Sequence, residues 1–366
     1  MKCSGICYFL EKFAPSRLAE DWDNTGLLLG SGQQEIKKVL VCLDITKTVA
    51  KEATEMGVDL VISHHPLIFK PLKRIDADSP KGSIIFSLVR NNIAVYSMHT
   101  NYDTAESGLN AALAARLELL DVTGLNNYKQ ESLYKIVVFV PADSVDKVRD
   151  AITAQGAGHI GNYSECTFFV QGTGTFRPLE NANPYIGKVN LLEKVDEFRL
   201  EAIVPVNNLK EVIDAMLKAH PYEEPAYDVY KLELDSKKYS LGKVGRLSRP
   251  MPMEEFINYV KQKLCIDIVR FTGDINAVVS KVAVFCGGFD GDFSGMKIHN
   301  PDVLVTGDVK HNVAVDILND GYNVIDAGHY DTEKIMVQET VRLLTENFKD
   351  IEVFAAKSEK RPFEYR

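Results

Sequence analysis

The chain has 366 residues, of which 45% are hydrophobic and 25% are charged. This length exceeds one typical core of about 100–200 residues, so we expect two or three domains. The composition is that of an ordinary globular protein and excludes a disordered or membrane-embedded chain. The formal net charge of −9 makes nucleic acid an unlikely partner, because affinity for a phosphate backbone comes from clustered Lys and Arg.

The N-terminus and the cysteines indicate a cytoplasmic protein. The first residues reach Glu11 and Lys12 without an apolar stretch long enough for a signal peptide or a membrane span. The six cysteines lack paired CxxC spacing, so we expect reduced thiols rather than a thiolate zinc site or a dense disulfide framework. We therefore expect no membrane partner.

Short apolar runs alternate with segments of helical periodicity, and this alternation predicts an α/β architecture. The expected strands of the flanking segments cover residues 39–43, 59–63, 93–98, 282–285, 303–306 and 323–325. Open α/β sheets bind ligands at the carboxyl ends of their strands, where the connecting loops converge. The histidine-rich turns of this chain follow such strand ends and mark the expected site.

The middle of the chain has a different pattern. Strand, helix and strand are expected over 134–140, 145–154 and 167–170, and again over 198–205, 209–219 and 226–232. Two βαβ units in tandem predict a ferredoxin-like module of about 110 residues. We interpret this module as an insert, residues 128–238, in a core formed by residues 1–127 and 239–366. Two separate α/β domains are the competing interpretation.

Two adjacent imidazoles follow a buried strand in Ser63-His64-His65-Pro66. Neutral imidazole is a common ligand of zinc, iron, nickel and manganese, so the pair favours metal ligands over a purely structural role. Side chains alternate along a strand, so both rings can face one pocket only where the backbone has already turned.

The next expected strand ends at His99-Thr100-Asn101-Tyr102-Asp103. Asp103 can bridge two cations, because a carboxylate has two oxygens. The alternative is that Asp103 caps a helix that begins near Glu106. We assign His99 a supporting role behind a metal ligand and include it among the catalytic candidates.

The last histidine-rich turn places Glu333 four residues after His329, a spacing that brings both side chains to one face of a helix. In the structural alternative, Asp331 or Thr332 caps a helix and Glu333 occupies its first turn. The two interpretations are compatible. Three imidazoles and two carboxylates can hold two divalent ions with open positions, the arrangement of metal-assisted hydrolysis. The predicted ligands are His64, His65, Asp103, His329 and Glu333.

Two further segments follow late strands. Asp308 and His311 place an acid and an imidazole after residues 303–306, and we predict proton-transfer or substrate-binding roles for them. Gly287 and Gly288 could let backbone amides approach a phosphate or another anion; a simple tight turn is the alternative. The P-loop lysine and the GxGxxG pattern are both missing there.

Several of these motifs together resemble the NIF-three-like family, the GTP cyclohydrolase 1 type 2 homologues. The motifs are Trp22-Asp23-Asn24-Thr25-Gly26-Leu27, Ser63-His64-His65-Pro66, His99-Thr100-Asn101-Tyr102-Asp103 and Asp326-Ala327-Gly328-His329-Tyr330-Asp331-Thr332-Glu333. The segment His220-Pro221-Tyr222-Glu223-Glu224-Pro225-Ala226-Tyr227-Asp228 resembles the insert of longer bacterial members, which is similar to the ferredoxin-like P-II and CutA folds.

The resemblance implies a NIF-three-like core of two α/β halves and a two-metal site with the five ligands named above. The ions would be zinc, iron, manganese or nickel. It also implies a toroidal homohexamer whose inserted domains cap a central cavity. Asn24, Gly287 and Gly288 are the expected substrate-binding residues, although the residues after the two glycines depart from many relatives.

Two functions remain open at this point. The first is a metal-dependent hydrolase that acts on a nucleotide or a related small molecule, and the family name carries the hydrolytic opening of the guanine ring of GTP. The second is a metal-binding regulatory or scaffolding hexamer with a ligand-sensing insert and no catalytic turnover.

Overall fold

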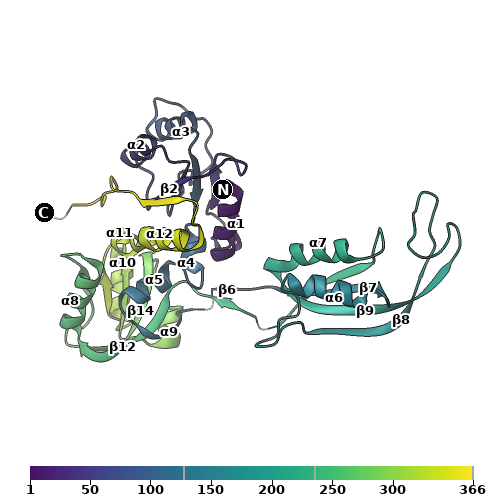
Figure 1. Ribbon diagram of the computed structural model, residues 1–366. Coiled ribbons are helices and arrows are strands. Elements are labelled where there is room, and N and C mark those ends of the chain that lie inside the picture. The colour runs from purple at the N-terminus through teal and green to yellow at the C-terminus, as the bar shows by residue number, and fades with distance from the viewer. Residues whose placement is uncertain (127, 235, 365–366) are drawn as a thin grey trace. The chain divides into compact units, whose positions relative to one another are not determined.

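The computed structural model describes residues 1–126, 128–234 and 236–364 (Figure 1). The chain divides into two compact units, one formed by Met1–Lys129 with Tyr239–Arg366 and the other by Gln130–Lys238. Asn127 and Arg366, two of the expected domain limits, lie outside the described residues. Several sheets alternate with helices, which confirms the expected mixed α/β class.

The first sheet of the discontinuous unit has the order β1-β4-β3-β2-β17. All of its strand pairs are parallel except the pairing of β1 with β4. Every residue of β3 and β4 is buried, as expected for parallel strands covered on both faces. The strands are β1 (Gly26–Leu29), β2 (Lys38–Cys42), β3 (Leu60–Ser63), β4 (Ala94–Ser97) and β17 (Glu352–Ala355).

Helices α2 (Lys47–Met56) and α3 (Pro80–Arg90) pack on one face of this sheet. Each helix begins at a hydroxyl residue whose side chain accepts a backbone N–H of the first turn. Thr46 accepts from Val49 at 3.2 Å, and Ser79 accepts from Gly82 at 3.1 Å.

The second sheet has the order β13-β16-β15-β14-β12-β5, with β14, β15 and β16 parallel. Helices α9 (Ser294–His299) and α10 (His311–Asn319) pack on one of its faces. The strands are β5 (Leu120–Gly124), β12 (Lys243–Pro252), β13 (Arg270–Thr272), β14 (Val278–Gly288), β15 (Val303–Gly307) and β16 (Val324–Asp326).

Strand β14 is longer than the sequence indicates. It continues through residues 286–288, because Gly288 still pairs with Gly307 of β15. The interpretation of Gly287 and Gly288 as a tight turn is therefore wrong. Both glycines belong to the strand.

The main hydrophobic core is shared by both sheets of this unit. It joins Ile62 of the first sheet and Val305 of the second with Leu344 of α12 (Ile335–Asn347). Helix α12 contacts β2 and β17, and it also contacts α5 (Leu109–Arg116), which contacts β14 (Figure 1). The remaining helices are α1 (Cys3–Phe13), η1 (Ser16–Leu18), α4 (Thr100–Thr104), α8 (Met253–Leu264) and α11 (His329–Glu333). Within the described residues, no helix combines the length and apolarity needed to cross a bilayer.

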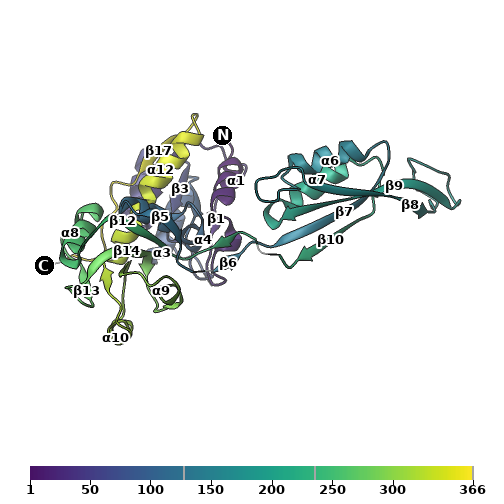
Figure 2. The same ribbon diagram turned by 90° about the horizontal axis from the view of Figure 1, so that it is seen from below.

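The second unit is one antiparallel sheet with two helices (Figure 2). Its elements follow the order β-α-β-β-α-β of the ferredoxin-like arrangement, and its strands lie in the order β10-β7-β9-β8. They are β7 (Leu133–Pro141), α6 (Val145–Ala154), β8 (Thr167–Phe176), β9 (Glu193–Pro205), η2 (Val206–Asn208), α7 (Leu209–Ala219) and β10 (Tyr227–Leu232). The short strands β6 (Lys129–Gln130) and β11 (Lys238–Tyr239) lie at the limits of this segment.

Helices α6 and α7 cover one face of this second-unit sheet. Val138 and Leu200 belong to the core beneath these helices. Side chains alternate along a strand, so Glu197 and Arg199 of β9 lie on the opposite face. That face carries the cavity described below.

Replacement of Leu344 by Ala tests the shared core. Leu344 is fully buried, so the variant should lose about 2–5 kcal/mol of folding free energy. The matched change Leu318→Ala, at an exposed position of α10, should cost less than about 0.5 kcal/mol. Chemical unfolding followed by the fluorescence of Trp22, the single tryptophan, measures both. Equal losses would contradict the placement of α12 in the core.

Candidate metal centre

The predicted donors meet where the carboxyl ends of the parallel strands of both sheets converge. His64 and His65 follow β3, and His99 follows β4 of the first sheet. His329 and Glu333 bound the short helix α11, which begins soon after β16 of the second sheet. Residues far apart in the sequence thus lie around one point, as the strand-end pattern predicts.

Glu333 lies at the centre of this cluster and is only 3% exposed. Its Oε1 lies 3.6 Å from His64 Nε2. Its Oε2 lies 3.2 Å from His65 Nε2 and 3.0 Å from His329 Nε2. Asp103 Oδ1 completes the arrangement at 3.7 Å from His64 Nε2.

The other nitrogen of each of these rings is held by an oxygen. His64 Nδ1 donates to the carbonyl of Met98 at 2.8 Å, and His65 Nδ1 donates to Asp44 at 2.9 Å. His329 Nδ1 lies 2.9 Å from Asp308 Oδ2. Such anchors fix the ring orientation and leave Nε2 as the ligand atom, the usual arrangement behind metal-binding histidines.

The backbone explains how two successive imidazoles reach one pocket. The hydroxyl of Ser63 donates to the carbonyl of His65 at 2.9 Å, and this bond closes the turn after β3. The strand alternation has ended there, so His64 and His65 both approach Glu333.

Three atoms of the cluster are buried and lack a hydrogen-bond partner among the described residues. They are His64 Nε2, Asp103 Oδ1 and Glu333 Oε2. Unpartnered buried polar atoms are costly. His64 Nε2 and Asp103 Oδ1 lie 3.7 Å apart, beyond hydrogen-bond distance, and Glu333 Oε2 faces the Nε2 atoms of His65 and His329. Imidazole nitrogen and carboxylate oxygen are donors for divalent transition metals, so these residues fit a metal ion. Two sets place their donor atoms within 4.8 Å of one another: His64, His65 and His99, and His65, His329 and Glu333.

Gly287 makes the central position of Glu333 sterically possible. A Cβ atom at residue 287 would lie 2.3 Å from Glu333 Oε1, and the backbone φ of 70° also favours glycine. The N–H of Gly287 donates to the hydroxyl of Thr332 at 3.1 Å. The main effect of Gly287 is therefore to leave space for the carboxylate of Glu333.

The ionisation of the cluster reflects its burial and its charges. Burial opposes protonation of His65, but its bond to Asp44 and the nearby Glu333 raise the pKa of His65 to about 10. Burial lowers the pKa of His64. Burial would raise the pKa of Glu333, yet the three imidazoles hold that pKa well below its usual range. Burial opposes protonation of His329 too, but Glu333 raises the pKa of His329 to about 9. A ligating imidazole nitrogen must be unprotonated, so a cation at this centre would compete with protons for Nε2 of His65 and of His329.

Comparison with known proteins identifies the family. The family model Duf34/NIF3 (NGG1p interacting factor 3) matches residues 1–362. The chain belongs to this family. It is 41% identical to a "GTP cyclohydrolase 1 type 2 homolog" of Halalkalibacterium halodurans, over 98% of each chain. A Bacillus subtilis protein of the same name is 42% identical, over 98% of this chain and 97% of its own. The crystal structure of a Bacillus cereus protein related to NIF3 superposes with a TM-score of 0.88 at 39% identity, covering 100% and 99% of the two chains.

In this Duf34/NIF3 member, two structural alternatives from the sequence are wrong. Asp103 does not cap the following helix, because it lies inside α4 and α5 begins only at Leu109 after Gly108. Thr332 and Asp331 do not cap α11 either, since this helix begins at His329. The spacing of His329 and Glu333 therefore lies within one helix, and Asp331 pairs with Lys334 at 2.8 Å.

Some of the predicted catalytic and substrate-binding residues contact the donor cluster, and others do not. Asp308 contacts His329, and Gly288 lies beside both. His311 begins α10 and is exposed, and its side chain makes no hydrogen bond or ion pair with another described residue, so its role stays a prediction. Asn24 holds the loop after β3 by donating to the carbonyl of Ile68, and its contact with substrate also stays a prediction.

The structure adds anchoring residues to the predicted set. Asp23 contacts His99 Nδ1 at 2.8 Å and accepts from Thr100. Burial would raise the pKa of Asp23, but these hydrogen bonds lower it to about 2, so the carboxylate stays ionised. Asp44 and the Met98 carbonyl anchor the other rings. The sequence indicates Asp44 as a candidate, because it directly follows an expected strand. It gives no indication of the role of the Met98 carbonyl.

A cavity of about 570 Å³ opens beside the cluster within the same unit. Asp44, His65, Asp308 and His329 line it on the side of the donor cluster. The basic residues Lys81, Lys360 and Arg361 also line it, and Arg361 contacts Asp331 at 2.7 Å. A small polar molecule can therefore reach the donors.

Removal of a ligand should abolish metal binding at this centre. We expect His65→Ala to leave no tightly bound divalent ion after the protein is stripped with EDTA, reloaded with Mn²⁺ or Zn²⁺ and desalted, because His65 belongs to both donor sets. Elemental analysis by mass spectrometry measures the retained ion. The control is His159→Ala, an exposed histidine of the second unit. Equal retention by both variants would contradict the assignment.

Loss of an anchor should weaken the site without removing a donor. Asp308→Asn is expected to reduce metal affinity by about 10–100-fold, because the ring of His329 loses its carboxylate partner. The matched change Asp316→Asn, exposed on α10, should have no effect. Competitive titration against a chelating dye compares the two variants, and an unchanged affinity of Asp308→Asn would rule out the anchoring role.

Proposed function

We propose that this chain is a dinuclear metal-dependent hydrolase that acts on a nucleotide or a related small molecule. One observation carries the proposal: the buried, unpartnered donor atoms of His64, Asp103 and Glu333 converge beside a cavity that a substrate can enter. Such atoms are expected where a cation, rather than a hydrogen bond, completes the site.

The two oxygens of Glu333 support two ions rather than one. Oε1 faces His64, whereas Oε2 faces His65 and His329. A carboxylate whose oxygens face different imidazoles is suited to hold a separate ion on each side, and Asp103 adds a second carboxylate on the His64 side. Zinc, iron, manganese and nickel all suit this mixture of imidazole and carboxylate donors. Bound ions would supply Lewis acidity and make water a stronger nucleophile.

The protein's own residues would position the reactants. Asp44, Asp308 and the Met98 carbonyl keep the rings aimed at the centre. His99, held by the ionised Asp23, can carry a proton at Nε2 next to the donors. These groups fit the hydrolysis of an electrophilic carbon or phosphorus.

The cavity supports a substrate with an anionic group. Lys81 and Lys360 line it, and both are exposed. A phosphate would find cationic partners there, as in nucleotides. The printed name of the bacterial relatives, GTP cyclohydrolase 1 type 2 homolog, makes GTP the first substrate to test.

Two features implied by the family resemblance also belong to this proposal. We infer that the chain forms a toroidal homohexamer and that the second unit is an inserted module of the P-II and CutA type. The β-α-β-β-α-β order of that unit supports the second inference. Neither feature is needed for the chemistry of the metal centre.

Turnover assays test the hydrolase. Metal-loaded protein is incubated with GTP and with a panel of nucleotide and aryl phosphoesters, and products are separated by chromatography. We expect release of product with at least one substrate, abolition in His329→Ala and unchanged rates in His159→Ala. Rates that are equal in the metal-loaded protein and in His329→Ala for every substrate would overturn the proposal.

A further inference from the structure

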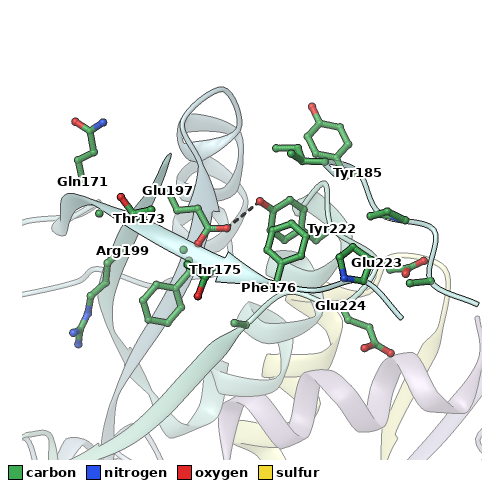
Figure 3. Close-up of a pocket in the computed structure, with 18 of the residues that line it drawn as sticks. Gln171, Thr173, Thr175, Phe176, Tyr185, Glu197, Arg199, Tyr222, Glu223 and Glu224 are labelled. Carbon is green, nitrogen blue, oxygen red and sulfur yellow. Dashed lines mark hydrogen bonds between the residues drawn. The ribbon is translucent and has the colours of Figure 1, made fainter. Parts of the chain in front are cut away.

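The second unit contains a cavity of about 530 Å³ that the metal centre does not use. It lies on the sheet face opposite α6 and α7, as the alternation along β9 requires. Its walls come from the second half of β8, the following loop and the turn after α7, within the one compact unit (Figure 3). The cavity is independent of the proposed hydrolase.

Aromatic rings form one side of the cavity. Figure 3 shows Phe176 and Tyr222 next to each other, with Tyr185 above them. The ring centroids of Phe176 and Tyr222 are 5.9 Å apart, and those of Tyr185 and Tyr222 are 6.1 Å apart. The faces of aromatic rings carry negative potential, so such a group of rings attracts an organic cation.

A buried carboxylate lies beside these rings. Glu197 is only 8% exposed and accepts a hydrogen bond from the hydroxyl of Tyr222 at 2.9 Å. It forms no salt bridge with a basic residue of the described chain. A buried carboxylate is normally paired with a cation, and a single neutral hydrogen bond leaves its charge unbalanced.

The backbone is shaped to admit this carboxylate. A Cβ atom at residue 174 would lie 2.0 Å from Glu197 Oε2, so the glycine at this position of β8 leaves room for the carboxylate where it lies. The position of Tyr222 is fixed as well. His220 Nδ1 accepts the backbone N–H of Tyr222 at 3.1 Å, and His220 Nε2 lies 3.0 Å from the carbonyl of Phe139.

The charge of the lining favours a cation. Three carboxylates, those of Glu197, Glu223 and Glu224, line the cavity together with one base, Arg199. The Nε of Arg199 lies 2.9 Å from Glu201, which also contacts Lys135 at 3.3 Å, so the three carboxylates still outnumber the single base of the lining. The remaining negative charge would repel phosphates, so this cavity is unsuited to nucleotides. Apolar residues on the same walls, Val170, Pro178 and Ile186, can contact the apolar body of a ligand.

We propose that the second unit binds a small organic cation, an ammonium group on an apolar or aromatic body, between the three aromatic rings and the carboxylate of Glu197. The ammonium group pairs with Glu197 and lies against Tyr222 and Phe176. The apolar body occupies the remainder of the cavity.

Calorimetry of the full chain, stripped of metal and kept in EDTA, tests this site with two probes of matched shape. Phenethylammonium carries the charge, and 2-phenylethanol is its neutral counterpart. We expect saturable binding of the charged probe, at least about 10-fold tighter than the neutral one, because a hydrogen bond to a charged group contributes about 1.5–3 kcal/mol. Equal affinities, or no saturable binding of phenethylammonium, would overturn the proposal without any variant.

The variant Glu197→Gln tests whether phenethylammonium binds beside this carboxylate. Glutamine keeps the shape and can still accept the Tyr222 hydroxyl, so the variant should fold, which circular dichroism verifies. Phenethylammonium should bind this variant as weakly as 2-phenylethanol binds the unmodified chain. The control Glu165→Gln, at an exposed position outside the cavity, should leave both affinities unchanged. An unaltered affinity in Glu197→Gln would refute this location.

Discussion

The burial of Glu333 is the constraint on which the first unit depends. A carboxylate removed from water requires compensation, and here the compensation comes from three imidazoles supplied by two different sheets. The sheets must therefore meet at the carboxyl ends of their parallel strands, with α11 beginning between them. The missing side chain of Gly287 and the shared core around α12 both serve this requirement.

Much of the fold follows from local pattern. The buried parallel strands β2, β3, β4 and β15 are short apolar runs, so the sequence indicates their positions directly. The end of β14 is harder to predict, because glycines disfavour strands on their own and the register of β14 on β15 shifts before Gly288 pairs with Gly307. Likewise β17 is short and half-buried, and only its pairing with β2, from the opposite end of the chain, makes it a strand.

The sequence predicts the donor residues of the candidate site better than it predicts the groups that anchor them. Imidazoles and acids that directly follow apolar runs are visible in the sequence, and the structure brings all five predicted ligands together. The supports depend on tertiary contacts. Asp23 reaches His99 across 76 positions, and a backbone carbonyl such as that of Met98 looks the same at every residue. His311 begins α10, and its predicted role rests on its strand-end position alone.

The division of the metal donors between the two segments of the first unit has a consequence for biosynthesis. A ribosome releases His64, His65, His99 and Asp103 first, then the entire second unit, and only afterwards His329 and Glu333. Until Glu333 has been synthesised, the nascent chain contains the imidazoles of His64 and His65 without the carboxylate that contacts them in the folded protein. In the proposed metal centre, a product truncated before residue 329 would therefore lack the carboxylate of Glu333 and one of the two donor sets.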